Sequence, residues 1–282
     1  MRFIHNLTKR PVEERYTEVL EMADTYCLPE LVPDAQMMVD LIRYLEAHDI
    51  GANTSVGTCR NNLTFREIAE FSNTEVWVSA GNGRYKVIYP RPGPKAEPWE
   101  DAAIEGSTPD IATVAEMLQG ALRHAFAPCT EQQLRIMRRE WALTGTRTPQ
   151  PRPVPSAGPR TPLRRISQQP EPLEASFQRI ADTGNRQLAS KAQAMLALIP
   201  LLERNRRYRR FWVYTDQADL LFTNADGPQA GIAVAIDSPY YTLNYALPAD
   251  AAPFPGARLS TSTLHAEAVD GLLEEGIRWL FR

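Results

Sequence analysis

The chain has 282 residues and a net charge of −3, with 43% hydrophobic and 23% charged residues, a balance that excludes the disordered and fibrous classes. Its longest apolar run, residues 194–202, contains Pro200 and is far shorter than the roughly 20 residues of a membrane helix. Three cysteines without a CxxC pair favour neither a disulfide framework nor a zinc site. We therefore expect no membrane partner, and, since no apolar segment follows the first ten residues, a cytoplasmic location.

Two helices are predicted near the beginning of the chain, over residues 11–26 and 34–48. The second helix carries apolar residues at the i, i+3, i+4, i+7 spacing of one buried face, namely Met38, Leu41, Ile42 and Leu45. Further along, Thr64 is followed three residues later by Glu67. That spacing is typical of a capping box, so it predicts a short helix over residues 65–71.

A β-hairpin is predicted over residues 75–89. Two strand-like runs, 75–79 and 84–89, lie on either side of Asn82-Gly83. Asn-Gly readily adopts the positive φ angles that a tight hairpin turn requires. A helix is then expected from Thr108-Pro109-Asp110 to about residue 126.

The second half is predicted to contain a long helix, four strands and a final helix. The long helix covers residues 173–203, with an apolar stripe made of Phe177, Ile180, Leu188, Met195, Leu196 and Ile199. The strand-like runs are 211–215, 219–223, 231–236 and 240–247. The final helix covers residues 263–281.

Part of the chain occurs twice, which indicates an internal duplication. Residues 98–126 match residues 253–281 at a constant offset of 155, beginning with Pro98-Trp99 and Pro253-Phe254. Just upstream, two tyrosines recur at an offset of 156, where Tyr85 and Tyr89 match Tyr241 and Tyr245. The predicted fold is therefore α+β, with two related modules that each contain a small antiparallel sheet covered by helices.

The predicted boundaries are residues 1–143 for the first module and 173–282 for the second. Residues 144–172 contain eight prolines, which favour an extended linker. Charge follows the same division, because residues 1–129 carry −7, residues 130–210 carry +10 and residues 211–282 carry −6. Such blocks either attract a partner of opposite sign or neutralise one another within the fold.

Paired aromatic residues are the first candidate partner-binding set. They are Trp77, Tyr85, Tyr89, Trp99, Trp212, Tyr241 and Tyr245, with Phe254 as the counterpart of Trp99. Trp and Tyr dominate binding hot spots, but large aromatic side chains also dominate protein cores. The sequence supports both interpretations and favours the core.

An arginine cluster in the basic middle of the chain is the second candidate. It contains Arg204, Arg206, Arg207, Tyr208, Arg209 and Arg210, and Arg135, Arg138, Arg139, Arg164 and Arg165 add to the same basic region. Arginine binds phosphate and stacks on bases, which suggests a nucleic-acid surface. The alternative is a solvated helix end, because cations complement the helix dipole at its C-terminus.

Catalytic signatures are scarce in this sequence. The four histidines are scattered, and no GxSxG, Walker or GxGxxG motif is present. We therefore predict no catalytic, metal-binding or cofactor-binding residues. The leading hypothesis is a non-catalytic protein that binds another protein, for example as an inhibitor or a toxin-neutralising, immunity-type partner. Nucleic-acid binding and an enzyme whose site assembles only in three dimensions are the alternatives.

Overall fold

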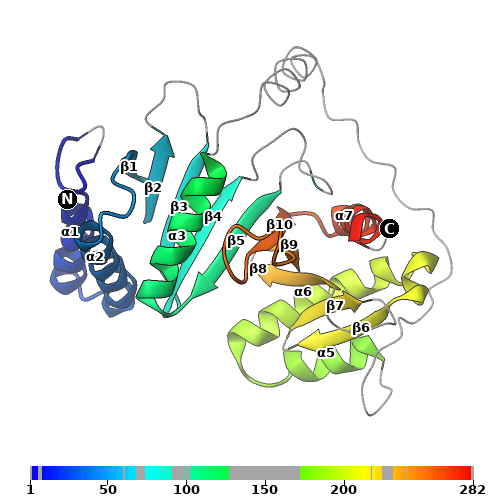
Figure 1. Ribbon diagram of the computed structural model, residues 1–282. Coiled ribbons are helices and arrows are strands. Elements are labelled where there is room, and N and C mark those ends of the chain that lie inside the picture. The colour runs from blue at the N-terminus through cyan, green and yellow to red at the C-terminus, as the bar shows by residue number, and fades with distance from the viewer. Residues whose placement is uncertain are drawn as a thin grey trace, which may run out of the picture. The chain divides into compact units, whose positions relative to one another are not determined.

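A computed structural model describes residues 2–5, 8–59, 61–67, 74–90, 99, 102–126, 172–216, 218–223, 231–237 and 239–280. The fold is α+β, with helices and antiparallel strands in two units (Figure 1). Unit 1 consists of Met1–Pro94, Ala103–Arg138 and Leu247–Arg258. Unit 2 consists of Lys95–Ala102, Arg139–Ala246 and Leu259–Arg282. The predicted linker, residues 144–172, lies outside the described residues except for Pro172.

Unit 1 begins with a helical hairpin. Helices α1 (Val12–Thr25) and α2 (Val32–Ala47) are joined through the short 3₁₀ helix η1 (Pro29–Leu31). The predicted apolar stripe of α2 is buried. A third helix, α3 (Ile111–Ala125), begins at Asp110, whose carboxylate accepts a hydrogen bond from the Thr113 backbone N–H at 2.7 Å.

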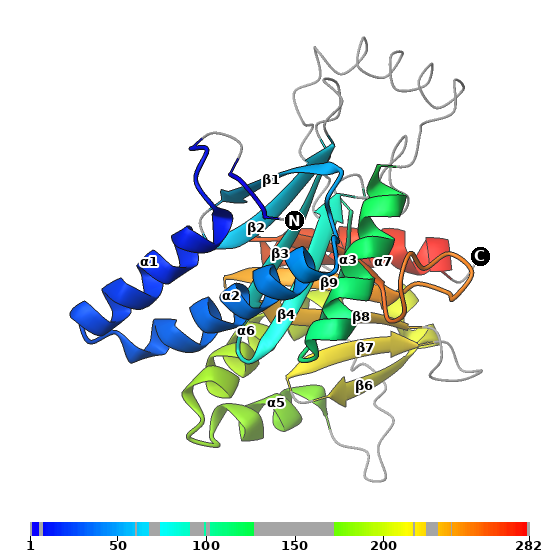
Figure 2. The same ribbon diagram turned by 60° about the vertical axis from the view of Figure 1, so that its left-hand side comes forward.

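Among its described residues, unit 1 has five antiparallel strands in sequence order. They are β1 (Thr54–Cys59), β2 (Asn62–Glu67), β3 (Glu75–Gly81), β4 (Arg84–Pro90) and β5 (Ala103–Thr108). The predicted hairpin is confirmed, and its turn has φ angles of 53° at Asn82 and 70° at Gly83. Helices α2 and α3 cover one face of this sheet (Figure 2). The strand residues facing them form the core, among them Val76, Val78 and Val87.

The predicted short helix over residues 65–71 is wrong in its described part, because residues 65–67 belong to strand β2, while residues 68–71 lie outside the described residues. Leu63 and Phe65 alternate into the core, where they pair with Val78 and Val76 of β3. Their burial requires the two-residue period of a strand. This tertiary packing outweighs the local capping pattern of Thr64 and Glu67.

Unit 2 also contains helices, antiparallel strands and a closing helix. Its helices are α5 (Leu173–Ala181), α6 (Arg186–Leu202), the 3₁₀ helix η2 (Arg206–Arg210) and the closing helix α7 (Ala266–Leu280). Its strands lie in the order β6 (Trp212–Asp216), β7 (Asp219–Thr223), β8 (Gly231–Asp237), β9 (Tyr240–Ala246) and β10 (Arg258–Thr263). The four predicted strands are confirmed, and β10 is an addition.

The long helix predicted over residues 173–203 is two helices. The chain leaves the helical path after Ala181, and Gly184 adopts a φ of 75°, a conformation that glycine adopts without a steric penalty. Asn185 then caps α6, since its side-chain oxygen accepts from the backbone N–H groups of Gln187 and Leu188 at 3.1 Å each. Helix α5 packs beside α6 as a hairpin.

Candidate functional site

The turn between α1 and α2 exposes a group of large apolar side chains. Four of the eight exposed large hydrophobic residues in the described part of the chain lie here, and we call them the hairpin tip: Met22, Tyr26, Leu31 and Val32. Tyr26 is 68% exposed and Met22 is 49% exposed. Contiguous apolar groups with a polar rim mark interaction surfaces on soluble proteins.

The hairpin tip has a defined backbone conformation. Helix α1 ends in a Schellman motif, in which the Leu28 N–H donates to the Ala23 carbonyl at 2.9 Å and the Cys27 N–H donates to the Asp24 carbonyl at 3.4 Å. Cys27 has the left-handed φ of 53° that this motif requires. Since Ala23 is buried, the neighbouring Met22 points away from the core. The turn therefore presents its apolar residues on a hydrogen-bonded frame.

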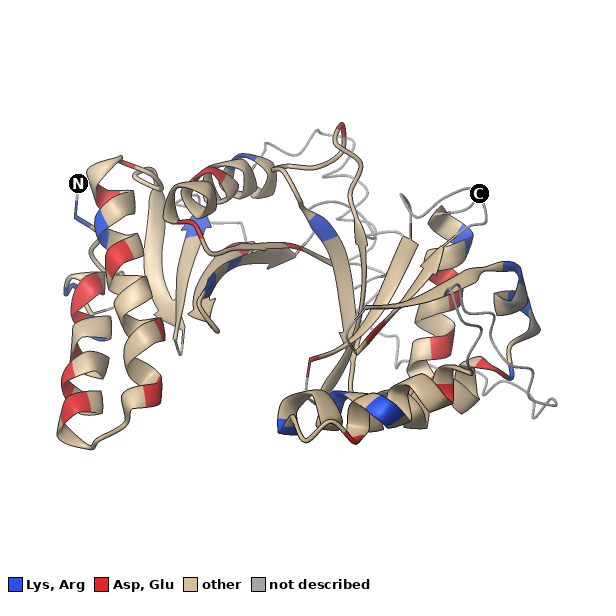
Figure 3. Cartoon of the chain, turned by 90° about the horizontal axis from the view of Figure 1, so that it is seen from below, with Lys and Arg blue, Asp and Glu red and all other residues tan. Residues whose placement is uncertain are grey.

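Carboxylates neighbour the hairpin-tip residues in the sequence. Glu21, Asp24 and Glu30 are exposed, and acidic residues recur along α1 and α2 (Figure 3). Nearer the start of α1, acids are neutralised by ion pairs such as Arg43–Glu13 at 2.6 Å. Within the described residues, no cation forms an ion pair with the three carboxylates of the tip. The rim is therefore negative, and its charges face solvent.

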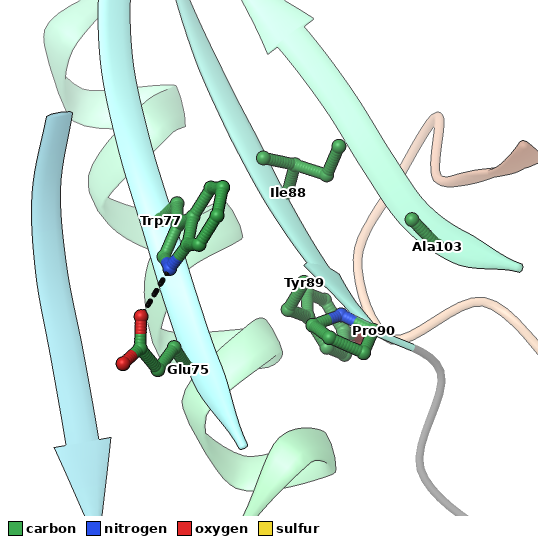
Figure 4. A pocket seen from close by; sticks show the side chains of 6 residues that line it. All are labelled: Glu75, Trp77, Ile88, Tyr89, Pro90 and Ala103. Atoms are coloured by element: carbon green, nitrogen blue, oxygen red, sulfur yellow. Dashed lines mark hydrogen bonds between the residues drawn. The ribbon is translucent and has the colours of Figure 1, made fainter. Parts of the chain in front are cut away.

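A pocket of about 250 Å³ lies on the sheet of unit 1 (Figure 4). It is lined by Glu75, Trp77, Ile88, Tyr89, Pro90 and Ala103. The one carboxylate among these lining residues already has two partners within the protein. Glu75 accepts a hydrogen bond from Trp77 Nε1 at 2.7 Å and forms an ion pair with Arg66. The pocket is therefore an apolar hollow without converging catalytic groups.

The predicted aromatic set divides according to burial. Tyr85, Tyr89, Trp99 and Tyr245 are at most 5% exposed, so these four side chains form core contacts and offer little surface to a partner. The other members are Trp77, which is 39% exposed, and the partly exposed Trp212 and Tyr241. Trp77 lies on β3 of unit 1, whereas Trp212 and Tyr241 lie on β6 and β9 of unit 2.

Two of the buried tyrosines have hydrogen-bond partners on helices. The Tyr85 hydroxyl donates to the Met37 carbonyl at 3.2 Å, and the Tyr89 hydroxyl lies 2.9 Å from His124 Nδ1. Burial raises the pKa of Tyr89 above its ordinary value. These contacts tie strand β4 to α2 and α3.

The arginine cluster forms η2 and is anchored to α7. Tyr208 is fully buried, and its hydroxyl lies 2.6 Å from the Asp270 carboxylate, which also accepts from Asn205 Nδ2 at 3.0 Å. Burial, reinforced by the charge of Asp270, raises the pKa of Tyr208. The ring of Tyr208 is therefore enclosed in unit 2 and does not present a face for base stacking.

The arginines of the cluster differ in their surroundings. Arg207 pairs with Glu274 of α7, which also contacts Arg278. Arg204 and Arg210 are exposed. The side chains of Arg206 and Arg209 lie outside the described part of the chain, as do Arg135, Arg138, Arg139, Arg164 and Arg165.

Replacing Tyr208 with phenylalanine is expected to lower the free energy of unfolding by about 1.5–3 kcal/mol, because the buried Asp270 carboxylate loses a donor. Urea unfolding followed by circular dichroism measures the change. The matched control is Tyr214→Phe, a partly exposed tyrosine of the same unit, which we expect to change stability by less than about 0.5 kcal/mol. Equal effects of the two substitutions would contradict a structural role for the Tyr208 hydroxyl.

Stability is expected to fall in alkali. Burial raises the pKa of Tyr16, Tyr89 and Tyr208 in the folded chain, whereas an unfolded tyrosine titrates at about 10. Their contribution is fully present below that pH and is lost as pH rises above it. Urea midpoints measured at increasing pH should decrease once tyrosinate forms in the unfolded chain, and a flat profile to about pH 11 would argue against this burial.

The groups that could support catalysis or metal binding lie on different elements. His48 stacks on Tyr44 with ring centroids 4.1 Å apart, while His265 immediately precedes α7. Cys27 and Cys59 are exposed free thiols. Among the described residues, no group of three or more His, Cys, Asp and Glu side chains is arranged to hold a metal ion.

Sequence reasoning missed the hairpin tip. The sequence signal for this surface is the short turn Tyr26-Cys27-Leu28-Pro29 between two amphipathic helices.

No described helix has the length and apolar character needed to cross a membrane. Comparison with protein-family models, with curated proteins and with solved structures finds no match for this chain.

Proposed function

We propose that this chain is a non-catalytic protein that binds another protein through the hairpin tip. The observation that carries the proposal is the gathering of four exposed apolar side chains at one hydrogen-bonded turn with a rim of carboxylates. Tyr and Met are enriched at protein interfaces, and a polar rim around an apolar centre is the usual anatomy of an interface. An inhibitor or an immunity-type partner is one form that such binding takes.

The partner's chemistry is complementary to the tip. Tyr26 and Met22 supply the apolar contacts, so the partner needs an apolar recess that admits them. Glu21, Asp24 and Glu30 are exposed and lie within four residues of these side chains in the sequence, so the recess needs basic residues at its edge. Such opposite charges increase the rate of association and reject acidic competitors. We therefore propose a basic protein surface as the target.

Charge reversal tests the electrostatic part of this proposal. The protein captured by the full-length chain from its native cell is purified, and its association rate is measured at low and high salt. Glu21→Lys with Glu30→Lys is expected to slow association about tenfold or more at low salt, with a smaller effect at high salt. The matched control is Asp237→Lys with Asp250→Lys, two exposed carboxylates outside the tip.

The control distinguishes local charge from net charge. Both double variants change the net charge equally, so only a tip contact makes the first slower than the second. Equal rates for the two variants would contradict the proposal. Binding to DNA or RNA that disappears with Arg204→Ala and Arg210→Ala would instead support the arginine region as the functional surface.

The organisation of the chain also supports a proposed duplication, with two related modules joined by the Pro- and Arg-rich linker of residues 144–172. The bounds of β3 and β8 differ by 156 residues, and those of α3 and α7 differ by 155. Five of the six buried positions of α2 recur 157 residues later in α6, where Ala35, Met38, Leu41, Ile42 and Leu45 correspond to Ala192, Met195, Leu198, Ile199 and Leu202. The match thus extends to the helices that precede each sheet.

A further inference from the structure

Unit 2 contains a slot for Trp99, a residue that lies between β4 and β5 in the sequence. Trp99 is 1% exposed, and its Nε1 donates to the Leu272 carbonyl of α7 at 2.9 Å. Its ring meets that of Tyr245 edge-on, with centroids 6.2 Å apart. A Cβ on Gly276 would lie 2.9 Å from Trp99 Cζ2, so the missing side chain at this position of α7 makes room for the indole.

Unit 1 contains a corresponding slot for Phe254, which lies between β9 and β10 in the sequence. Phe254 is 4% exposed. A Cβ on Gly106 of β5 would lie 2.6 Å from Phe254 Cε2, and a Cβ on Gly120 of α3 would overlap the Pro253 carbonyl oxygen. Two glycines of unit 1 therefore make room for the segment that carries Phe254.

The two segments occupy equivalent positions in the sequence, and each packs against residues of the other half of the chain. Trp99 and Phe254 are 155 residues apart, and each lies between the fourth and fifth strands of its own half. Lys95–Ala102 nevertheless belongs to unit 2, and Leu247–Arg258 belongs to unit 1. We call these two segments the connectors. Each unit fills its slot with the connector of the other half.

We propose that each slot is an interaction site, and that its ligand is the aromatic connector from the other half of the chain. Neither half of the sequence contains all the residues of its own core, so the two halves are obligate partners. Cutting the chain between them leaves the exchanged connectors in place. The halves therefore remain associated without a covalent link.

Photo-crosslinking in the full-length chain tests the exchange directly. With p-benzoylphenylalanine at position 99, we expect crosslinks to the α7 peptide that contains Leu272. With the same residue at position 254, we expect crosslinks to peptides that contain Gly106 or Gly120. Crosslinks from position 99 to α3, or none to α7, would overturn the proposal.

Substituting the glycines that make room for the connectors gives an independent test, which is read by hydrogen exchange. Each substitution in one half should affect the connector of the other half. Gly276→Val should increase exchange in residues 95–102 and in α7, and should leave residues 247–258 unchanged. Gly120→Val should do the opposite, with faster exchange in residues 247–258 and in α3. Gly81→Val is the control, because a Cβ at Gly81 meets no atom within 4 Å. If either variant fails to fold, the alanine version takes its place.

Cleavage of the intact protein tests the association of the halves. A protease site is placed between residues 144 and 172 of the full-length chain, and the purified protein is cut after folding. We expect the two fragments to elute together in buffer and to separate only in denaturant. Separation of the fragments in buffer would show that each half completes its own core. The same conclusion would follow if each glycine variant increased hydrogen exchange only in the connector of its own half.

Discussion

Replacing Trp99 with alanine is expected to lower the free energy of unfolding by about 3–5 kcal/mol, the usual cost of deleting a fully buried tryptophan. The substitution removes an indole that is 1% exposed and the hydrogen bond to the Leu272 carbonyl. It also leaves a cavity beside Tyr245, which packs on Trp279 with ring centroids 5.0 Å apart. Urea unfolding of the full-length chain measures the loss.

Trp77→Ala is the matched control for this experiment. Trp77 is 39% exposed on the sheet of unit 1, and its indole N–H donates to Glu75 on the same strand. Its replacement should cost less than about 1 kcal/mol, as for most surface substitutions. A loss at Trp77 as large as that at Trp99 would contradict the assignment of Trp99 to a core.

Removing the apolar side chains of the hairpin tip should have the largest effect on binding. Met22→Ser with Tyr26→Ser is expected to weaken partner affinity about 100-fold or more, because hot-spot residues contribute 2 kcal/mol or more each. Both side chains are exposed in the free chain, so the unfolding free energy should change by less than about 0.5 kcal/mol. Isothermal titration calorimetry gives the affinity, and urea unfolding gives the stability.

Two other exposed apolar residues, outside the hairpin tip, provide the control for binding. Tyr240 is 45% exposed and Leu264 is 53% exposed, both in unit 2. Tyr240→Ser with Leu264→Ser removes a similar apolar surface and should leave the affinity unchanged. If this control weakens binding as much as the tip variant, the effect comes from general surface hydrophobicity.

Much of the fold could be predicted where one local pattern dominates. The stripe of α2 has the helical spacing, and Asn82-Gly83 specifies the turn between β3 and β4. Strands β5 and β10 were missed because their sequences, Ala-Ile-Glu-Gly-Ser-Thr and Arg-Leu-Ser-Thr-Ser-Thr, contain few large apolar residues. Their pairing with neighbouring strands, which is tertiary information, makes them strands.

The surfaces were harder to predict than the elements. Met22 belongs to helix α1 and Tyr26 directly follows it, and their exposure depends on how α1 packs beside α2. Tyr208 lies within five arginines in the sequence, yet it packs against Asp270, which is 62 residues away. The exchange of connectors is a long-range property as well, because Pro-Trp and Pro-Phe fit the core of either unit by their local chemistry.

Protection of Cys27 tests the central claim most directly. Cys27 directly follows Tyr26 of the hairpin tip and Cys59 lies on β1, and both thiols are exposed, so the second serves as an internal reference. The alkylation rate of each is measured by peptide mass spectrometry with and without the captured partner. We predict that the partner slows alkylation of Cys27 roughly tenfold or more, because a docked interface excludes solvent, while Cys59 reacts as before. Unchanged reactivity of Cys27 in the saturated complex would show that the partner binds elsewhere.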